Sequence, residues 1–443
     1  MEKTYRPYDR DQLFLLPPAL QDWLPEEHLV YFLADLVDQL DLAAITTGYE
    51  QELRGYPPYH PRMMTTLLLY AYTVGIPSSR RIAQRCQEDV AFRVLTANNT
   101  PDFRTISAFR KRHLPALQAL FVQVLRCCQQ AGLVKLGTIA LDGTKVRANA
   151  SKHKAMSYGR MQSEVARLET EVAQLLAQAE ATDAAEDARY GADCRGDELP
   201  AELARRETRL ATIRAAMTAL EAEARAAASA EPPPRRRGRP PEPPPGTPSP
   251  KAQRNFTDPD SRIMRDADKA FLQAYNAQIA VDAPAQVIVA CAVTNQAADA
   301  PHAVPLVDAI RANTRRRPRR ILADAGYWSA ATAAALARRQ IDAYLATGKL
   351  KHSSPPPPAP RGRIPQGLGP KERMQRKLRT HRGRTLYARR KAIVEPVFGL
   401  LKRARGFRQF LLRGLAKVQG EWALICTGHN LLKLYRSGRW AMA

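Results

Sequence analysis

The stretch GTIALDGTKV, residues 137–146, decides the fold class, because its short apolar run ends in an acid that is followed by glycine. β-Branched and aromatic residues recur in 270–293, where Asp282-Ala283-Pro284 has the composition of a hairpin turn. Further helices are expected at 305–312 and 330–339, and further strands at 321–324 and 344–346. Strands followed by strand–helix alternation predict a mixed α/β sheet.

Three acids in this text are candidates for chemistry. Asp142 and Asp324 each end a short apolar strand and precede a glycine or an Ala-Gly pair, which suits either a ligand site or an ordinary turn or helix cap. Glu395 lies in a segment with the pattern of a helix, and Pro396 is expected in the first turn of that helix. A single Glu on a helix can be a metal ligand or a solvated surface residue. Asp299 is expected to cap the helix that follows it.

Three carboxylates in a basic chain could together bind the divalent metal ions that cleave a phosphodiester. Cleavage of a phosphodiester uses two divalent ions roughly 3.5–4 Å apart, and hard cations such as Mg²⁺ take oxygen ligands. Two strand ends and a helix packed on the sheet could supply those oxygens from rigid elements. The combination therefore favours a metal site built by Asp142, Asp324 and Glu395.

The sheet is interrupted between its first strand and the hairpin. Apolar residues follow heptad spacing at about 160–180 and again at about 202–223, which predicts an antiparallel helical hairpin with a loop at 181–198. This hairpin could pair within one chain or with a second copy. The text EPPPRRRGRPPEPPPGTPSP at 231–250 predicts an extended tether, and 353–370 is a second proline-rich tract.

The N-terminal part is expected to be helical. The apolar run from Pro61 to Val74 is broken by Gly75-Ile76-Pro77, and a basic helix with Arg80, Arg81 and Arg85 follows. Helix, short turn and basic helix is the pattern of a helix-turn-helix DNA reader, although a plain supporting bundle shows it too.

Charge is the strongest global signal. The chain of 443 residues has 68 Lys and Arg against 43 Asp and Glu, a formal net charge of +25. Such an excess suits a polyanion, since Lys and Arg replace the counterions of phosphates. No apolar run is long enough to span a membrane and the first residues lack a secretory signal, so a cytoplasmic, DNA-binding protein is expected.

Two further basic runs are weaker candidates for DNA contact. The run TRRRPRR at 314–320 could clamp a DNA backbone or form a solvated loop. The text from Arg237 to Pro240 is similar to the core of an AT-hook, whose arginines enter a narrow minor groove, but four residues can match by accident.

Taken together, several pieces of this sequence resemble the DDE transposases of bacterial insertion sequences. The matching text is ALDGTKVRANAS around Asp142, NFTDPDSRIMR at 255–265, YNAQIAVD at 275–282, LADAGYWS around Asp324 and VEPVFGLLK around Glu395. The resemblance implies a ribonuclease-H-like catalytic domain in which Asp142, Asp324 and Glu395 bind two Mg²⁺ or Mn²⁺ ions.

The same resemblance implies residues that hold DNA. The family often has Tyr, two residues, Arg, three residues, Glu, six residues and Lys in its last block. Here Tyr387 and Arg390 keep their mutual spacing, as do Glu395 and Lys402, but one extra residue places Lys391 at the expected Arg position. The residues expected to contact DNA are Lys145, Arg147, Tyr387, Arg390, Lys391 and Lys402.

The expected function is metal-dependent cleavage at transposon ends, followed by transfer of the freed 3′-hydroxyl into target DNA. The expected partners are double-stranded DNA, as terminal inverted repeats and target, and further copies of the chain in a homodimer or larger assembly in the bacterial nucleoid. The alternatives are a structure-selective nuclease or resolvase, which cuts without joining, and a catalytically dead DNA-binding relic or repressor.

The sequence thus divides into four expected parts. They are an N-terminal helical, DNA-binding region at 1–135; a catalytic domain at 136–154 and 254–436; a helical-hairpin insertion at 155–230; and a Pro/Arg-rich linker at 231–253.

Overall fold

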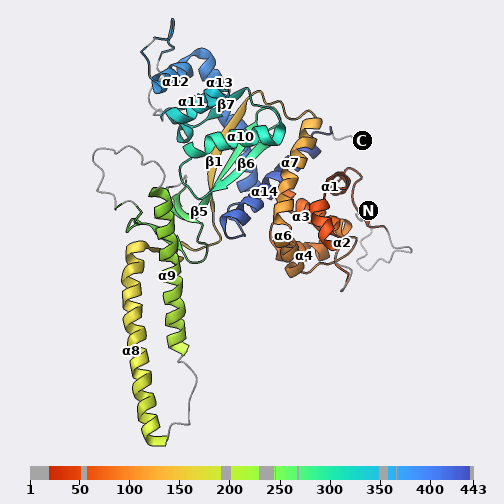
Figure 1. Cartoon of the computed structure of the whole chain (residues 1–443). Coiled ribbons are helices and arrows are strands. Elements are labelled where there is room, and N and C mark those ends of the chain that lie inside the picture. Colours follow the sequence, from red (N-terminus) through yellow and green to blue (C-terminus); the bar gives the residue numbers. More distant parts are fainter. Residues whose placement is uncertain are drawn as a thin grey trace, which may run out of the picture.

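The computed structural model describes residues 19–50, 57–190, 201–228, 244, 246–266, 269–348, 358–365 and 367–439. Its centre is a six-stranded mixed sheet, flanked by helices on both faces (Figure 1). A compact group of helices lies to one side, and a long helical pair projects from the other end. This arrangement confirms the expected mixed α/β class and the helical N-terminal region.

The N-terminal region consists of short helices. They are η1 (Leu20–Trp23), α1 (Leu29–Asp38), α2 (Ala43–Glu50), α3 (Pro61–Thr73), α4 (Ser79–Glu88), α5 (Val90–Thr96), α6 (Phe103–Arg112) and α7 (Leu114–Gln130). Several begin at side-chain caps: Asp89 accepts from the amide of Ala91, and Asp102 from the amide of Arg104. Such caps satisfy amide groups that have no partner inside the helix.

The sheet is built from strands that are far apart in sequence. Its members are β1 (Ile139–Arg147), β4 (Arg262–Arg265), β5 (Phe271–Asp282), β6 (Ile288–Thr294), β7 (Arg320–Ala323) and β8 (Asp342–Leu345). The order is β4-β5-β1-β7-β8, and β6 also pairs with β5. β5 runs antiparallel to β1, β4 and β6, whereas β1, β7 and β8 are parallel.

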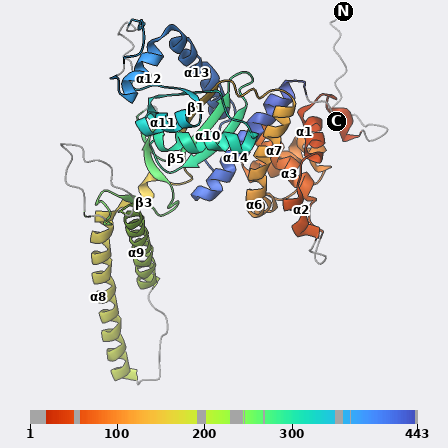
Figure 2. The same cartoon turned by 45° about the horizontal axis from the view of Figure 1, so that its top comes forward.

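Helices cover the sheet and connect it to the N-terminal region. The remaining elements of the body are η3 (Ala300–His302), α10 (Ala303–Thr314), η4 (Ala325–Tyr327), α11 (Ala330–Arg338), α12 (Pro370–Arg379), α13 (His381–Gly399), the π-helical turn η5 (Leu400–Ala404) and α14 (Leu415–Arg436). The mostly buried helix α14 contacts α3, α7 and β6, so it lies between the N-terminal helices and the sheet (Figure 2). One hydrophobic core therefore runs from the N-terminal helices into the sheet.

The projecting pair consists of α8 (Tyr158–Tyr190) and α9 (Ala201–Ala228). Its base is a small antiparallel ladder between β2 (Ala155–Ser157) and β3 (Gln253–Asn255). The pair has its own small core, in which Met161, Leu168 and Ile213 are buried. It extends away from the body in both views (Figures 1 and 2).

Two local expectations are wrong. The segment 181–190, expected as loop, continues α8, because it is rich in alanine, which favours helix, and contains no glycine or proline. Pro396 lies in the last turn of α13, not in the first. A proline has no amide hydrogen to donate to the carbonyl four residues earlier, and Gln286 Nε2 donates to that carbonyl of Ala392 instead, at 3.0 Å.

No helix within the described ranges is both long enough and apolar enough to cross a membrane.

Candidate active site at the ends of β1 and β7

The register of the two parallel central strands brings Asp142 and Asp324 together. Ala140 of β1 is paired with Leu322 of β7, and each acid lies two residues further along its own strand. Because side chains alternate across a strand, equal offsets place both acids at the same level and on the same face. Both side chains are half-buried.

The two carboxylates interact electrostatically. Burial raises the pKa of Asp142 from its ordinary 3.8 to about 6, the Arg390 guanidinium lowers it, and the Asp324 carboxylate raises it. Arg390 Nη1 lies 3.1 Å from Asp142 Oδ2, while the amide of Gly143 donates to Oδ1 at 2.9 Å. Burial and a neighbouring carboxylate both disfavour the ionised form of an acid, and a bound cation would offset this cost.

Asp299 is the residue that the sequence interpretation misplaced. Its side chain makes no helix-capping hydrogen bond. Instead Oδ1 accepts from Asn276 Nδ2 at 2.7 Å and from Gln278 Nε2 at 2.8 Å, and Lys145 Nζ lies 3.6 Å away. The expectation failed because the two amides come from β5, whose position beside β1 is not visible in the local text around Asp299.

The glycines that follow the two acids are needed for this arrangement. A Cβ on Gly143 would lie 2.9 Å from Asp299 Oδ1, and one on Gly326 would lie 2.8 Å from Asp299 Oδ2. Gln278 also approaches Gly143, and its Oε1 accepts from the hydroxyl of Tyr327. Gly143 therefore makes room for side chains of the protein, rather than for a ligand as the sequence suggested.

Helix α13 supplies the cation beside Asp142. Arg390 and Tyr387 are half-buried and contact each other near the acids, and the side chain of Lys391 is exposed. Burial lowers the pKa of Lys402 in η5, whose Nζ donates to the carbonyl of Lys145 at 2.9 Å and to Thr144 Oγ1. Arg390, and not Lys391 at the expected spacing, thus contacts the acid of β1.

Glu395 differs from the other two acids in its exposure. It is exposed on α13, between the buried Val394 and Val397. Within the described residues, no group of three or more His, Cys, Asp or Glu side chains is close enough to hold a metal ion. The structure therefore joins Asp142 with Asp324 and leaves Glu395 on the solvent side of its helix.

The donor set around Asp142 and Asp324 fits a hard divalent cation. Carboxylate oxygens are the ligands that Mg²⁺ and Mn²⁺ prefer, and such ions keep waters and substrate phosphates in their remaining positions. Burial raises the pKa of Asp142 in spite of the Arg390 guanidinium, so a further cation beside this acid would be favourable. The fit rests on two acids.

The other expected DNA contacts are spread over the surface. Arg147 is exposed at the end of β1, and Arg80 and Arg81 are exposed on α4. The basic run at 314–320 lies at the start of β7, whereas Asp324 follows its end, so this run is not beside the acids. The text from Arg237 to Pro240 lies outside the described residues.

One basic residue of the expected N-terminal DNA-binding region has a structural role. Arg110 of α6 is buried and donates to Tyr72 Oη at 3.1 Å, to the carbonyl of Pro77 at 2.7 Å and to Ser79 Oγ at 3.2 Å. It thereby ties α6 to α3 and to the start of α4.

Two family models match the chain. Residues 18–112 match the family described as a transposase domain (DUF772), and residues 246–431 match the family described as a transposase DDE domain. Comparison with curated proteins and with solved structures gave no match. The second match includes Asp299, Asp324 and Arg390, while Asp142 lies between the two matched segments.

Proposed function

Because the chain belongs to the DDE transposases of insertion-sequence type, we propose that it cleaves the ends of its element and transfers the freed 3′-hydroxyl into target DNA. The observation that supports this most directly is the shared register of Asp142 and Asp324 at the ends of two parallel strands. We interpret the sheet as ribonuclease-H-like, with β1 antiparallel to β5 and parallel to β7.

In this proposal Asp142, Asp324 and Glu395 hold two Mg²⁺ or Mn²⁺ ions. Such ions, when bound, activate the attacking oxygen and stabilise the leaving oxygen of a phosphodiester. Glu395 is the third acid because it lies on α13, the helix whose Arg390 contacts Asp142. Its exposed side chain would turn toward the acids only in the complex with DNA.

The cations around the acids bind and orient DNA. Arg390 lies beside Asp142 and presents a planar guanidinium, which suits a phosphate. Lys402, Lys145 and Arg147 extend the positive charge along β1, and Lys391 extends it along α13, where the neutral Tyr387 offers a hydroxyl to DNA. The proposed partners are the terminal inverted repeats and target DNA in the nucleoid, bound by two or more copies of the chain.

The test uses a labelled duplex with a terminal repeat, Mg²⁺ and an unlabelled target plasmid. Wild-type protein should release a 3′-hydroxyl end and join it to the plasmid. Asp142→Asn, Asp324→Asn and Glu395→Gln should each abolish cleavage and leave binding of the duplex nearly unchanged, because these acids bind metal and not phosphate.

Three outcomes would contradict the proposal. Cleavage near the wild-type rate by one variant would remove that acid from the site. Cleavage without a joined product would identify a nuclease or resolvase instead. A wild-type protein that binds the repeat without cutting it would identify a DNA-binding relic.

A further inference from the structure

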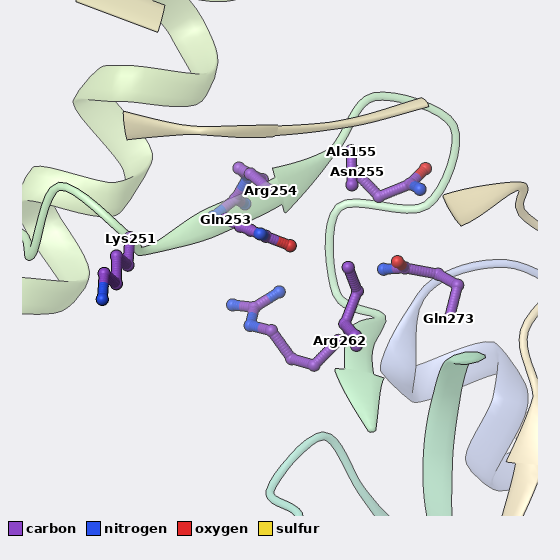
Figure 3. Close-up of a pocket in the computed structure, with 8 residues that line it drawn as sticks. Ala155, Lys251, Gln253, Arg254, Asn255, Arg262 and Gln273 are labelled. Carbon is purple, nitrogen blue, oxygen red and sulfur yellow. The ribbon is translucent and has the colours of Figure 1, made fainter. Parts of the chain in front are cut away.

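A cavity lies where the helical pair meets the body, away from the acids. Its volume is about 310 Å³, and the polar side chains that line it include Lys251, Gln253, Arg254, Arg262 and Gln273 (Figure 3). These come from β3, β4, β5 and the segment that precedes β3. We call this cavity the junction pocket.

The junction pocket is cationic. It has three positive side chains, and the carboxylate that contacts two of them is Glu223 of α9. Arg254 Nη1 donates to Glu223 Oε1 at 2.7 Å, and Arg262 Nη2 lies 3.0 Å from Oε1 and 2.9 Å from Oε2. Three cations against one acid leave an excess of positive charge for an anionic ligand.

The side chains of the two arginines are largely buried, whereas that of Glu223 is exposed. The side chains of Arg254 and Arg262 are 15% and 25% exposed, and that of Glu223 is 49% exposed. Arg262 Nη1 is also fixed by the carbonyls of Pro259, at 2.6 Å, and Ser261, at 3.1 Å. An incoming anion can therefore displace Glu223 into solvent while the guanidinium of Arg262 stays in place.

Gln273 indicates that the ligand also carries hydrogen-bond donors. Its side chain is almost fully buried and Nε2 donates to Ser261 Oγ at 2.8 Å, but among the described residues Oε1 has no partner. An acceptor in this position lacks a donor, which costs free energy when the site is empty. The hydrated backbone of a DNA duplex offers both phosphate oxygens for the arginines and bound water that can donate to the amide oxygen of Gln273.

We propose that the junction pocket binds the backbone of double-stranded DNA, and that Glu223 competes with a DNA phosphate for Arg254 and Arg262. The inference rests on the proposed function. Gln273 lies six residues before Ile279, the partner of Asp142 in the ladder between β5 and β1. Six residues of strand span about 20 Å, which corresponds to roughly six base pairs of duplex. The pocket thus holds DNA about half a turn from the acids.

The experiment measures binding of a fluorescent 30-base-pair duplex of arbitrary sequence by the full chain, in EDTA, over a series of salt concentrations. Log affinity falls with log salt, and each lost phosphate contact makes this slope less steep by about 0.9. The double variant Arg254→Gln and Arg262→Gln should make the slope less steep by about 0.9 to 1.8. Glu223→Gln should instead raise the affinity for DNA about fivefold, since a negative charge next to the phosphate is removed.

Controls separate this proposal from a purely structural role of the ion pairs. Arg214→Gln removes a pair with Glu169 elsewhere on the helical pair and should leave the slope unchanged. Lys251 is an exposed residue of the junction pocket, so Lys251→Gln should fold. It should make the slope less steep by about 0.9 even if the arginine variants fail to fold.

Two results would overturn the proposal. One is an unchanged slope in Lys251→Gln and in the folded arginine variants. The other is weaker DNA binding by Glu223→Gln, which would show that the ion pairs only hold the helices in place. If the wild-type chain binds no duplex at all, both this inference and the proposed function fail.

Discussion

Asp142→Asn should stabilise the metal-free protein at pH 8. The acid is mostly buried, with 19% of its side chain exposed, and it lies close to the Asp324 carboxylate. Asparagine has nearly the same shape and no charge, so the substitution removes the cost of keeping a charge in this position.

The sign follows from the raised pKa. Burial raises the pKa of Asp142 from 3.8 to about 6, so the folded state holds a proton more tightly than the unfolded state. Stability from this group is therefore complete below about pH 4 and is lost as the pH rises through 6. Two pKa units correspond to about 3 kcal/mol, or to a rise in Tm of roughly 3–4 °C for a chain of 443 residues.

The assay is thermal unfolding in EDTA at pH 4 and at pH 8, for the wild type and the variant. The variant should gain about 3 kcal/mol at pH 8 and almost nothing at pH 4. Adding Mg²⁺ should raise the Tm of the wild type and not that of the variant, since only the wild type keeps both acids.

A control with the opposite sign is available on the surface. Hydrogen bonding to Arg339 lowers the pKa of Asp308, so Asp308→Asn should lower stability at pH 8 slightly. An equal gain for Asp142→Asn at both pH values, or no gain at pH 8, would refute the electrostatic description of the site.

Three other predictions concern α13 and the insertion. Arg390→Gln removes the guanidinium that lowers the pKa of Asp142, so the pH profile of cleavage should shift to higher pH and the rate should fall; an unshifted profile would exclude this contact. Gln286→Ala leaves the carbonyl of Ala392 without its donor and should cost about 1 kcal/mol in urea unfolding, whereas an unchanged midpoint would show that water replaces the bond. Replacing 155–250 with a short flexible linker should leave a body that unfolds cooperatively near the wild-type Tm, because the helical pair has its own core; a body that fails to fold would refute this modularity.

Local sequence was sufficient for the elements and the family. Strand periodicity around Asp142 and in 270–293 predicted β1, β5 and β6, and helical periodicity predicted the N-terminal helices, because each pattern reports which face of one element is buried. The resemblance to DDE transposases is confirmed by the two family matches. The assignment of Asp142, Asp324 and Glu395 as metal ligands remains a prediction.

Only the tertiary structure decided how these elements combine. The pairing of β1 with β7 sets Asp142 beside Asp324, although 182 positions separate them in the sequence. The carboxylate of Asp299 meets amides of β5, and the carbonyl freed by Pro396 meets Gln286, because a polar group without a partner in its own element bonds to whatever strand or turn lies nearest in space. A one-dimensional pattern records the burial of a residue but not the identity of its neighbour, so strand register, the Arg390 contact and the junction pocket were not visible until the sheet was assembled.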